Sequence, residues 1–122
     1  MNEAQSIVQR YIDTWNETDP LERRALIAEV FAEDVDYTDP LASVSGHDAI
    51  DQFISAAQKQ FAGLRFSLAG SVDSHHSQAR FTWHLGPPGI EEPIVVGFDV
   101  AVIEAGHMRS VYGFLDRVPA RA

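Results

Sequence analysis

The spacing of apolar residues predicts three helices in the first half of the chain. The first covers about residues 3–16, and its apolar positions follow the spacing of one helix face: Ile7, Val8, Tyr11, Ile12 and Trp15. Asp19, Pro20 and Glu22 form a helix start signal, which places the second helix at about residues 20–32. The side chains expected on its buried side are Leu26, Ile27, Val30 and Phe31.

The third helix is predicted at about residues 47–62. A start signal at Ser45-Gly46-His47-Asp48 precedes it, and Gly63 is a typical stop. Its apolar positions again have helical spacing: Ala49, Ile50, Phe53, Ile54, Ala57 and Phe61. Between the second and third helices, FAEDVDYTDP alternates, with Val35 and Tyr37 on one side and acidic residues on the other.

Beyond Gly63 the apolar period changes to two, which predicts strands. Residues 64–68 and 81–85 form two short runs separated by the polar turn SVDSHHSQ. The segment PIVVGFDVAVIEAGHMRSVYGFLDRV predicts two longer strands joined by a turn at Ala105-Gly106. Residues 1–122 are therefore expected to form a single α+β domain, in which three N-terminal helices cover the concave face of a curved antiparallel sheet.

Charge and composition exclude several classes of partner. The chain of 122 residues has 18 acidic and 9 basic residues, a formal net charge of −9, which opposes binding to nucleic acid or to an anionic membrane surface. Its start, MNEAQSIVQR, lacks the features of a secretion signal, and no apolar stretch approaches the length of a membrane span. We expect a cytoplasmic protein that binds neither nucleic acid nor membrane.

The sequence gives little support for a metal site or for a nucleophilic catalytic residue. The chain has no cysteine, which removes thiolate ligands and thiol nucleophiles. His75 and His76 are adjacent in a predicted turn and point in different directions, with no third ligand at a suitable spacing. His84 should face away from Phe81 and Trp83, and His47 should be exposed in the first turn of the third helix. We expect no metal site, and no nucleophile elbow is present.

Three residues are candidates for chemistry, and each has two interpretations. Asp39 precedes Pro40, which favours extended backbone, so it is either part of a polar turn or a carboxylate held at a pocket. Asp99, in VVGFDVAVI, either points inward, where burial would raise its pKa, or faces water on an open sheet face. Tyr11 is either a core tyrosine or a catalytic one.

Four short motifs connect these residues: VQRY, FAEDVDYTDP, GHDAIDQF and GFDV. Their order resembles that of the ketosteroid isomerases and the SnoaL-like polyketide cyclases, which belong to the nuclear transport factor 2-like superfamily, and the resemblance covers nearly the whole chain. It implies a cystatin-like, cone-shaped half-barrel. It also implies that Asp39 is a general base, and that Tyr11 and a protonated Asp99 form an oxyanion hole.

The resemblance implies a small hydrophobic carbonyl compound as ligand and cofactor-free acid–base catalysis, either isomerisation or aldol-type ring closure. Proton abstraction next to a carbonyl needs an ionised base near the carbon and donors aimed at the oxygen. The side chains expected to line the pocket are Trp15, Phe53, Phe81, Trp83, Val111 and Leu115.

Two other functions are considered. A non-catalytic ligand-binding or interaction domain could use the same cone. Epoxide opening by water would need an Asp–Arg–Asp arrangement, for which Arg80 and Arg109 lack the expected acidic neighbours. The resemblance further implies a homodimer through the convex face of the sheet, where Tyr112 and Phe114 would otherwise form an exposed apolar patch.

Overall fold

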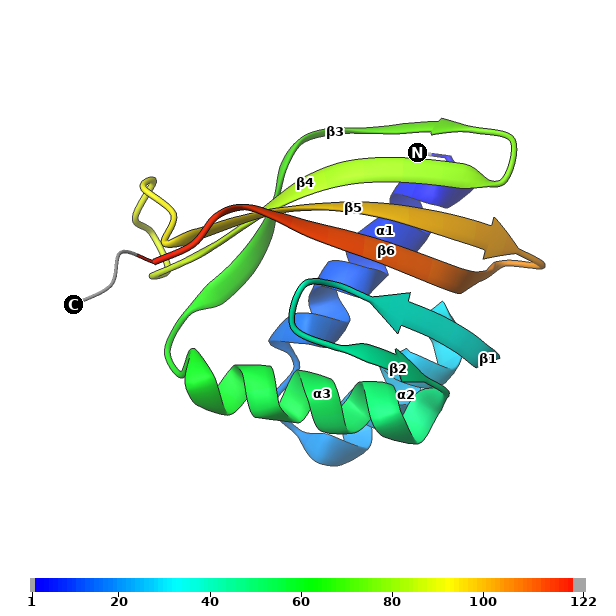
Figure 1. Cartoon of the computed structure of the whole chain (residues 1–122), viewed down its shortest axis with the longest axis horizontal. Helices are drawn as coiled ribbons and strands as arrows, with labels where there is room; N and C mark the ends of the chain where they lie inside the picture. Colours follow the sequence, from blue (N-terminus) through cyan, green and yellow to red (C-terminus); the bar gives the residue numbers. More distant parts are fainter. Residues whose placement is uncertain (1, 120–122) are drawn as a thin grey trace.

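A curved, unclosed sheet with three helices on one side makes up the fold (Figure 1). The structure is a computed structural model, and it describes residues 2–119. The elements, in chain order, are α1 (Glu3–Asn16), α2 (Pro20–Val30), β1 (Phe31–Thr38), β2 (Ser43–Ser45), α3 (His47–Gln60), β3 (Arg65–His75), β4 (Gln78–Gly86), β5 (Val95–Glu104) and β6 (His107–Arg117). The six strands are ordered β2-β1-β6-β5-β4-β3 across the sheet. No helix in residues 2–119 is long and apolar enough to cross a membrane.

The helices do not all precede the sheet. Strands β1 and β2 lie between α2 and α3 in the chain, and β1 pairs in parallel with β6, the last strand. The sheet is therefore mixed, whereas an antiparallel sheet after three helices was predicted. The alternation of FAEDVDYT accounts for β1, because Val35 and Tyr37 are buried while Asp34 and Asp36 are exposed.

Helix α2 ends at Val30, two residues before the predicted end. Phe31 has extended backbone angles and begins β1, while its backbone N–H still bonds to the carbonyl of Ile27. A buried apolar residue at this position fits both the helical and the strand pattern, so spacing alone misplaced the boundary. The start of α2 is as predicted: the Asp19 side chain accepts hydrogen bonds from the backbone N–H groups of Leu21 and Glu22.

The core lies between the helices and the concave face of the sheet. Alternate residues of β4 and β5 point into it, including Phe81, Leu85 and Ala101. The turn between β5 and β6 is at Ala105-Gly106, as predicted, and both residues have positive φ, 51° and 80°. Two consecutive positive φ values are typical of the hairpin turn whose twist matches the flanking strands.

Two polar clusters fix the C-terminal end of α1. The Asn16 side chain donates to the carbonyl of Phe66 across 2.9 Å and accepts from its N–H across 2.8 Å, which attaches α1 to β3. The Gln58 side chain of α3 donates to the carbonyl of Trp15 across 3.0 Å. Gln58 is in turn held by the buried Arg23 of α2, which also pairs with Asp51 across 2.7 Å. The three helices therefore place Trp15 jointly.

Candidate functional site

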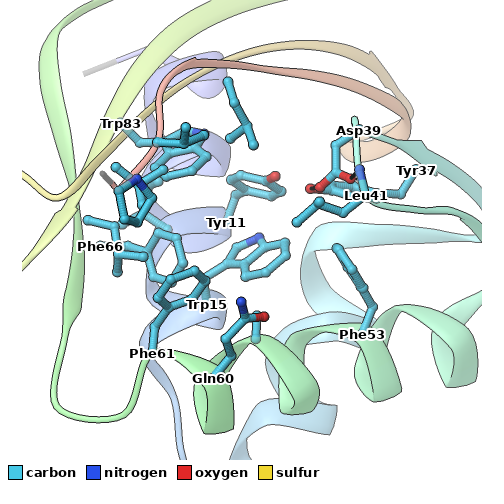
Figure 2. Close-up of a pocket in the computed structure, with 17 residues that line it drawn as sticks. Tyr11, Trp15, Tyr37, Asp39, Leu41, Phe53, Gln60, Phe61, Phe66 and Trp83 are labelled. Carbon is cyan, nitrogen blue, oxygen red and sulfur yellow. Dashed lines mark hydrogen bonds between the residues drawn. The ribbon is translucent and has the colours of Figure 1, made fainter. Parts of the chain in front are cut away.

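A cavity of about 260 Å³ opens between the helices and one end of the concave face (Figure 2). Its walls are mostly apolar, and the described residues that line it are Tyr11, Ile12, Trp15, Tyr37, Asp39, Leu41, Phe53, Ala57, Gln60, Phe61, Phe66, Trp83, Leu85, Val95, Leu115, Val118 and Pro119. Within residues 2–119, Asp39 is the one charged side chain among them. A concave apolar site with a few convergent polar groups is typical of small-molecule binding.

The structure brings together most, but not all, of the predicted site residues. Those that line the cavity are Tyr11, Trp15, Asp39, Phe53, Trp83 and Leu115. Phe81, Val111 and Asp99 are fully buried and are not among its lining residues. Asp99 lies behind Tyr11, so the Tyr11 hydroxyl stands between the Asp99 carboxyl and the cavity.

Asp39 is held in a tight turn at the wall of the cavity. Its Oδ1 accepts hydrogen bonds from the backbone N–H groups of Leu41 and Ala42, across 2.8 and 3.0 Å. Its Oδ2 accepts from the hydroxyl of Tyr37 across 2.6 Å. The two interpretations of Asp39-Pro40 are thus both correct, because the turn is what orients the carboxylate. A carboxylate has about four acceptor positions, so these three bonds leave one acceptor position free.

Asp99 points inward and is 2% exposed. Its Oδ2 accepts a hydrogen bond from Tyr11 Oη across 2.8 Å. Burial raises the pKa of the Asp99 carboxyl from 3.8 to about 6, the hydrogen bonds from Tyr11 and Trp83 oppose this rise, and the charge of Asp39 adds to it. Burial, followed by the nearby Asp99, also holds the pKa of Tyr11 well above its usual value of 10.0, so its proton stays in place for donation.

Two glycines allow this packing. A Cβ at Gly113 would lie 2.9 Å from Asp99 Oδ1 and 3.2 Å from Asp39 Cβ, so the residue separates the two carboxylates without a side chain of its own. A Cβ at Gly97 would lie 2.0 Å from the Trp83 ring, which occupies the place of a side chain there. Glycine inside a strand often marks such a close approach.

Tyr37 is a polar residue of the site that sequence reasoning treated only as the buried side of a strand. It is 4% exposed, lines the cavity and bonds to Asp39. Burial, and then the nearby Asp99 and Asp39, raise the pKa of its hydroxyl well above 10.0. A signal was present, because residues two apart in an extended segment share a face, which places Tyr37 beside Asp39.

The arginines and histidines lie elsewhere. Arg80 pairs with Asp73 across 3.0 Å and Arg109 with Asp34 across 3.1 Å, so the expectation that they lack acidic neighbours was wrong. Both pairs are exposed, and neither arginine lines the cavity.

His47 is half-buried, not exposed, and its Nε2 lies 2.9 Å from the carbonyl of Phe31. In the described part of the chain, no three His, Asp or Glu side chains gather in a way that could hold a metal ion.

Comparison with known proteins shows which family this chain matches. The model of the SnoaL-like domain family matches residues 8–111. A crystal structure of a candidate isomerase of the SnoaL-like family from Agrobacterium tumefaciens is 38% identical to this chain, with a TM-score of 0.88, and the match covers 95% of this chain and 99% of that one. None of the proteins with curated functions matches the chain.

More distant structures share the fold. A candidate ketosteroid isomerase from Kribbella flavida has a TM-score of 0.71 at 18% identity, covering 98% of this chain and 82% of that one. A candidate SnoaL-like polyketide cyclase from Jannaschia has a TM-score of 0.75 at 16% identity, covering 93% of this chain and 85% of that one. At these identities the likeness concerns the arrangement of helices and strands, and not the chemistry of the site.

Proposed function

We propose, from the premise that this chain belongs to the SnoaL-like domain family, that it is an enzyme that enolises a compact apolar carbonyl compound without a cofactor. The overall reaction would be an isomerisation or an aldol-type ring closure, since both pass through an enolate. The observation that carries the proposal is that a carboxylate, Asp39, and a hydrogen-bonded phenol, Tyr11, line the same apolar cavity.

The proposed step transfers one proton and moves one electron pair. Asp39 Oδ2 takes a proton from the carbon next to the carbonyl, and the C–H electron pair forms the enolate while negative charge develops on the oxygen. Tyr11 Oη–H donates to that oxygen. Return of the proton from Asp39 to a different carbon completes an isomerisation. In a ring closure, the enolate carbon attacks a second carbonyl, and the proton held by Asp39 passes to the alkoxide oxygen that forms there.

Asp99 supports Tyr11 in this step. In its neutral form, the Asp99 carboxyl can donate its own proton to Tyr11 Oη, which frees the Tyr11 proton for the ligand. An enolate oxygen near Tyr11 favours that neutral form, because negative charges in an apolar site repel each other. The pair therefore becomes a better donor as charge develops on the ligand, which is the behaviour that accelerates a reaction.

The dimensions of the cavity favour a ligand of one or two rings. Its volume of about 260 Å³ lies just below the roughly 300–1,000 Å³ of sites for drug-sized molecules. Around it stand the rings of Phe53, Phe61 and Phe66, which suit a flat, unsaturated or aromatic ligand. We therefore propose a two-ring ketone such as 1-tetralone as a suitable probe.

The second function to consider is ligand binding without catalysis. It is favoured by the same apolar cavity and needs neither carboxylate. Epoxide opening ranks below both, because among the described residues no arginine lines the cavity. The two leading functions differ in whether a bound ketone exchanges the protons beside its carbonyl.

Exchange of these protons in D₂O, followed by proton NMR of 1-tetralone, tests the proposal. The unmodified chain should accelerate exchange at C2, and Asp39→Asn should reduce that acceleration by about a hundredfold to ten-thousandfold, the range for loss of a general base, while ketone binding persists. Tyr37→Phe, which removes one bond to the base, should reduce it by about tenfold. Tight binding of the ketone with no accelerated exchange would favour the non-catalytic function instead.

A further inference from the structure

One buried donor in the cavity has no partner. Trp15 is 8% exposed, and its Nε1 is the one buried side-chain nitrogen or oxygen in residues 2–119 that makes no hydrogen bond. Buried polar groups in folded proteins are nearly always paired, because an unmade bond costs the desolvation of the donor without return. The indole of Trp15 lies close enough to Tyr11 to oppose the rise in the pKa of that hydroxyl, yet its N–H makes no hydrogen bond within the described residues and can donate to a ligand.

Packing fixes the orientation of this indole. The Trp15 ring makes an edge contact with Phe53, with ring centres 5.9 Å apart, and tilted contacts with Tyr37 and Phe66 at 5.9 and 5.4 Å. Its backbone carbonyl is held by Gln58. In Figure 2, the indole nitrogen is turned toward the hydroxyl of Tyr11. The N–H therefore points toward the part of the cavity where the proposed chemistry takes place.

The other tryptophan provides a comparison within the same cavity. Trp83 also lines it, and its side chain lies close enough to Asp99 to oppose the rise in the pKa of that carboxyl, as the Trp15 side chain does for the Tyr11 hydroxyl. The two indoles differ in burial, because Trp15 Nε1 is buried without a hydrogen bond whereas the Trp83 side chain is half-buried. An indole N–H can donate but not accept, so the group that meets Trp15 must be an acceptor.

We infer that Trp15 is a ligand-binding residue whose Nε1–H donates a hydrogen bond to the carbonyl oxygen of the bound compound, beside the donor Tyr11 Oη. A carbonyl oxygen has two lone pairs and can accept from both. The identity of the acceptor as a carbonyl rests on the proposed function, but the binding role of Trp15 does not require turnover. The ligand class is a flat ketone that is otherwise apolar and carries its oxygen at the inner end of the cavity.

A matched pair of ligands tests the inference on the unmodified chain. 1-Tetralone and tetralin have the same two-ring skeleton, and only the first has an oxygen. With ¹⁵N-labelled tryptophan the chain gives two indole signals, which Trp83→Phe assigns. Binding of 1-tetralone should move the Trp15 indole proton downfield, and tetralin should not. The inference is overturned if both ligands move the signal equally, if bound ketone leaves it in place, or if the ketone binds no more tightly than tetralin.

The variant Trp15→Phe provides a second measurement, because it keeps an aromatic ring and removes the N–H. Affinity for 1-tetralone should fall by about three- to tenfold, the range for one neutral hydrogen bond, while affinity for tetralin stays the same. Equal losses for both ligands would mean that the ring acts through packing alone, and would overturn the inference. The indole shift decides the matter if this variant folds poorly.

The outcomes separate this inference from the proposed function. An indole shift without proton exchange would retain Trp15 as a ligand donor and remove the enzyme proposal. Proton exchange with no indole shift would retain the enzyme proposal and remove Trp15 as a ligand donor.

Discussion

Tyr11 Oη donates a hydrogen bond of 2.8 Å to Oδ2 of Asp99, a residue 88 positions away in the chain. This bond joins the first helix to the fifth strand inside the core. It is also a bond between two titratable groups, with Tyr37, Asp39 and the Trp83 side chain close to one or both. Its strength and the stability of the fold should therefore depend on pH.

The first prediction concerns that pH dependence. The pKa of Asp99 is about 6 in the folded chain against 3.8 as its ordinary value, so the folded state binds more protons than the unfolded state between these values. The contribution of Asp99 to stability is fully present below the lower value and is lost as pH rises through the higher one. The free energy of unfolding, relative to Asp99→Asn, should fall by about 2 kcal/mol from about pH 4 to pH 7.

Urea unfolding of both proteins over this pH range measures the difference. Asparagine cannot ionise, so it removes the Asp99 titration and leaves the other acidic groups in place. Parallel stability curves for the two proteins would show that Asp99 titrates as an ordinary carboxyl, and the prediction would be wrong.

The second prediction concerns Gly97 and Trp83. Because a Cβ at Gly97 would lie 2.0 Å from the Trp83 ring, Gly97→Ala should displace that indole and cost about 1–3 kcal/mol of stability, the range for overpacking. The Trp83 indole signal should move in ¹⁵N NMR, and ketone affinity should fall. Thr82→Ala, at a neighbouring half-buried position of β4, is the control. An unchanged Trp83 signal in Gly97→Ala would contradict the described packing.

The third prediction compares two arginines. Arg23 is 5% exposed and pairs with Asp51, whereas the pair of Arg10 and Glu29 is about half exposed on both sides. Arg23→Met leaves a partly buried carboxylate unpaired and should cost about 2–4 kcal/mol in urea unfolding. Arg10→Met, the matched control, should cost less than about 1 kcal/mol. Similar losses for the two variants would mean that the Arg23 cluster adds no more than a surface ion pair.

The fourth prediction concerns the convex face of the sheet, where we propose that a second copy of the chain binds. Phe98 pairs with Phe114 and Val100 with Tyr112 across β5 and β6, and the two aromatic residues of β6 are 58% and 46% exposed. Light scattering should give the mass of a dimer at micromolar concentration, and Phe114→Glu should give a monomer. Leu21→Glu, at an exposed apolar residue of α2, should remain dimeric. A monomeric mass for the unmodified chain would remove this proposal.

Sequence spacing predicted the elements that bury one face and expose the other. Both ends of helix α1 were predicted correctly, because its apolar stripe is continuous and its opposite face is polar. The position of the turn between β5 and β6 was also predicted correctly, because Gly106, which adopts positive φ without strain, lies between two apolar runs. The parallel pairing of β1 with β6 could not be predicted in this way, because local spacing does not report which strand lies beside which.

The orientation of Asp99 illustrates the same limit at the site. Both faces of β5 are apolar, with Ala101 on the inner face and Phe98 and Val100 on the outer one, so alternation could not say which face was the core. The pairing of Tyr37 with Asp39 was within reach of the strand period. The sequence could not predict that the Trp15 N–H makes no hydrogen bond, because this depends on which residues the complete fold places around the indole.

The pairing of β1 also determines when the site can form. Strand β1, which leads to Asp39, has β2 of three residues on one side and β6 on the other. As the chain is synthesised, β1 must therefore wait for about 70 further residues before its longer neighbour is made. Contacts between such distant segments slow folding, because the intervening chain must be ordered first. A nascent chain should thus hold its helices early and acquire its carboxylate pair, and any activity, in the last step.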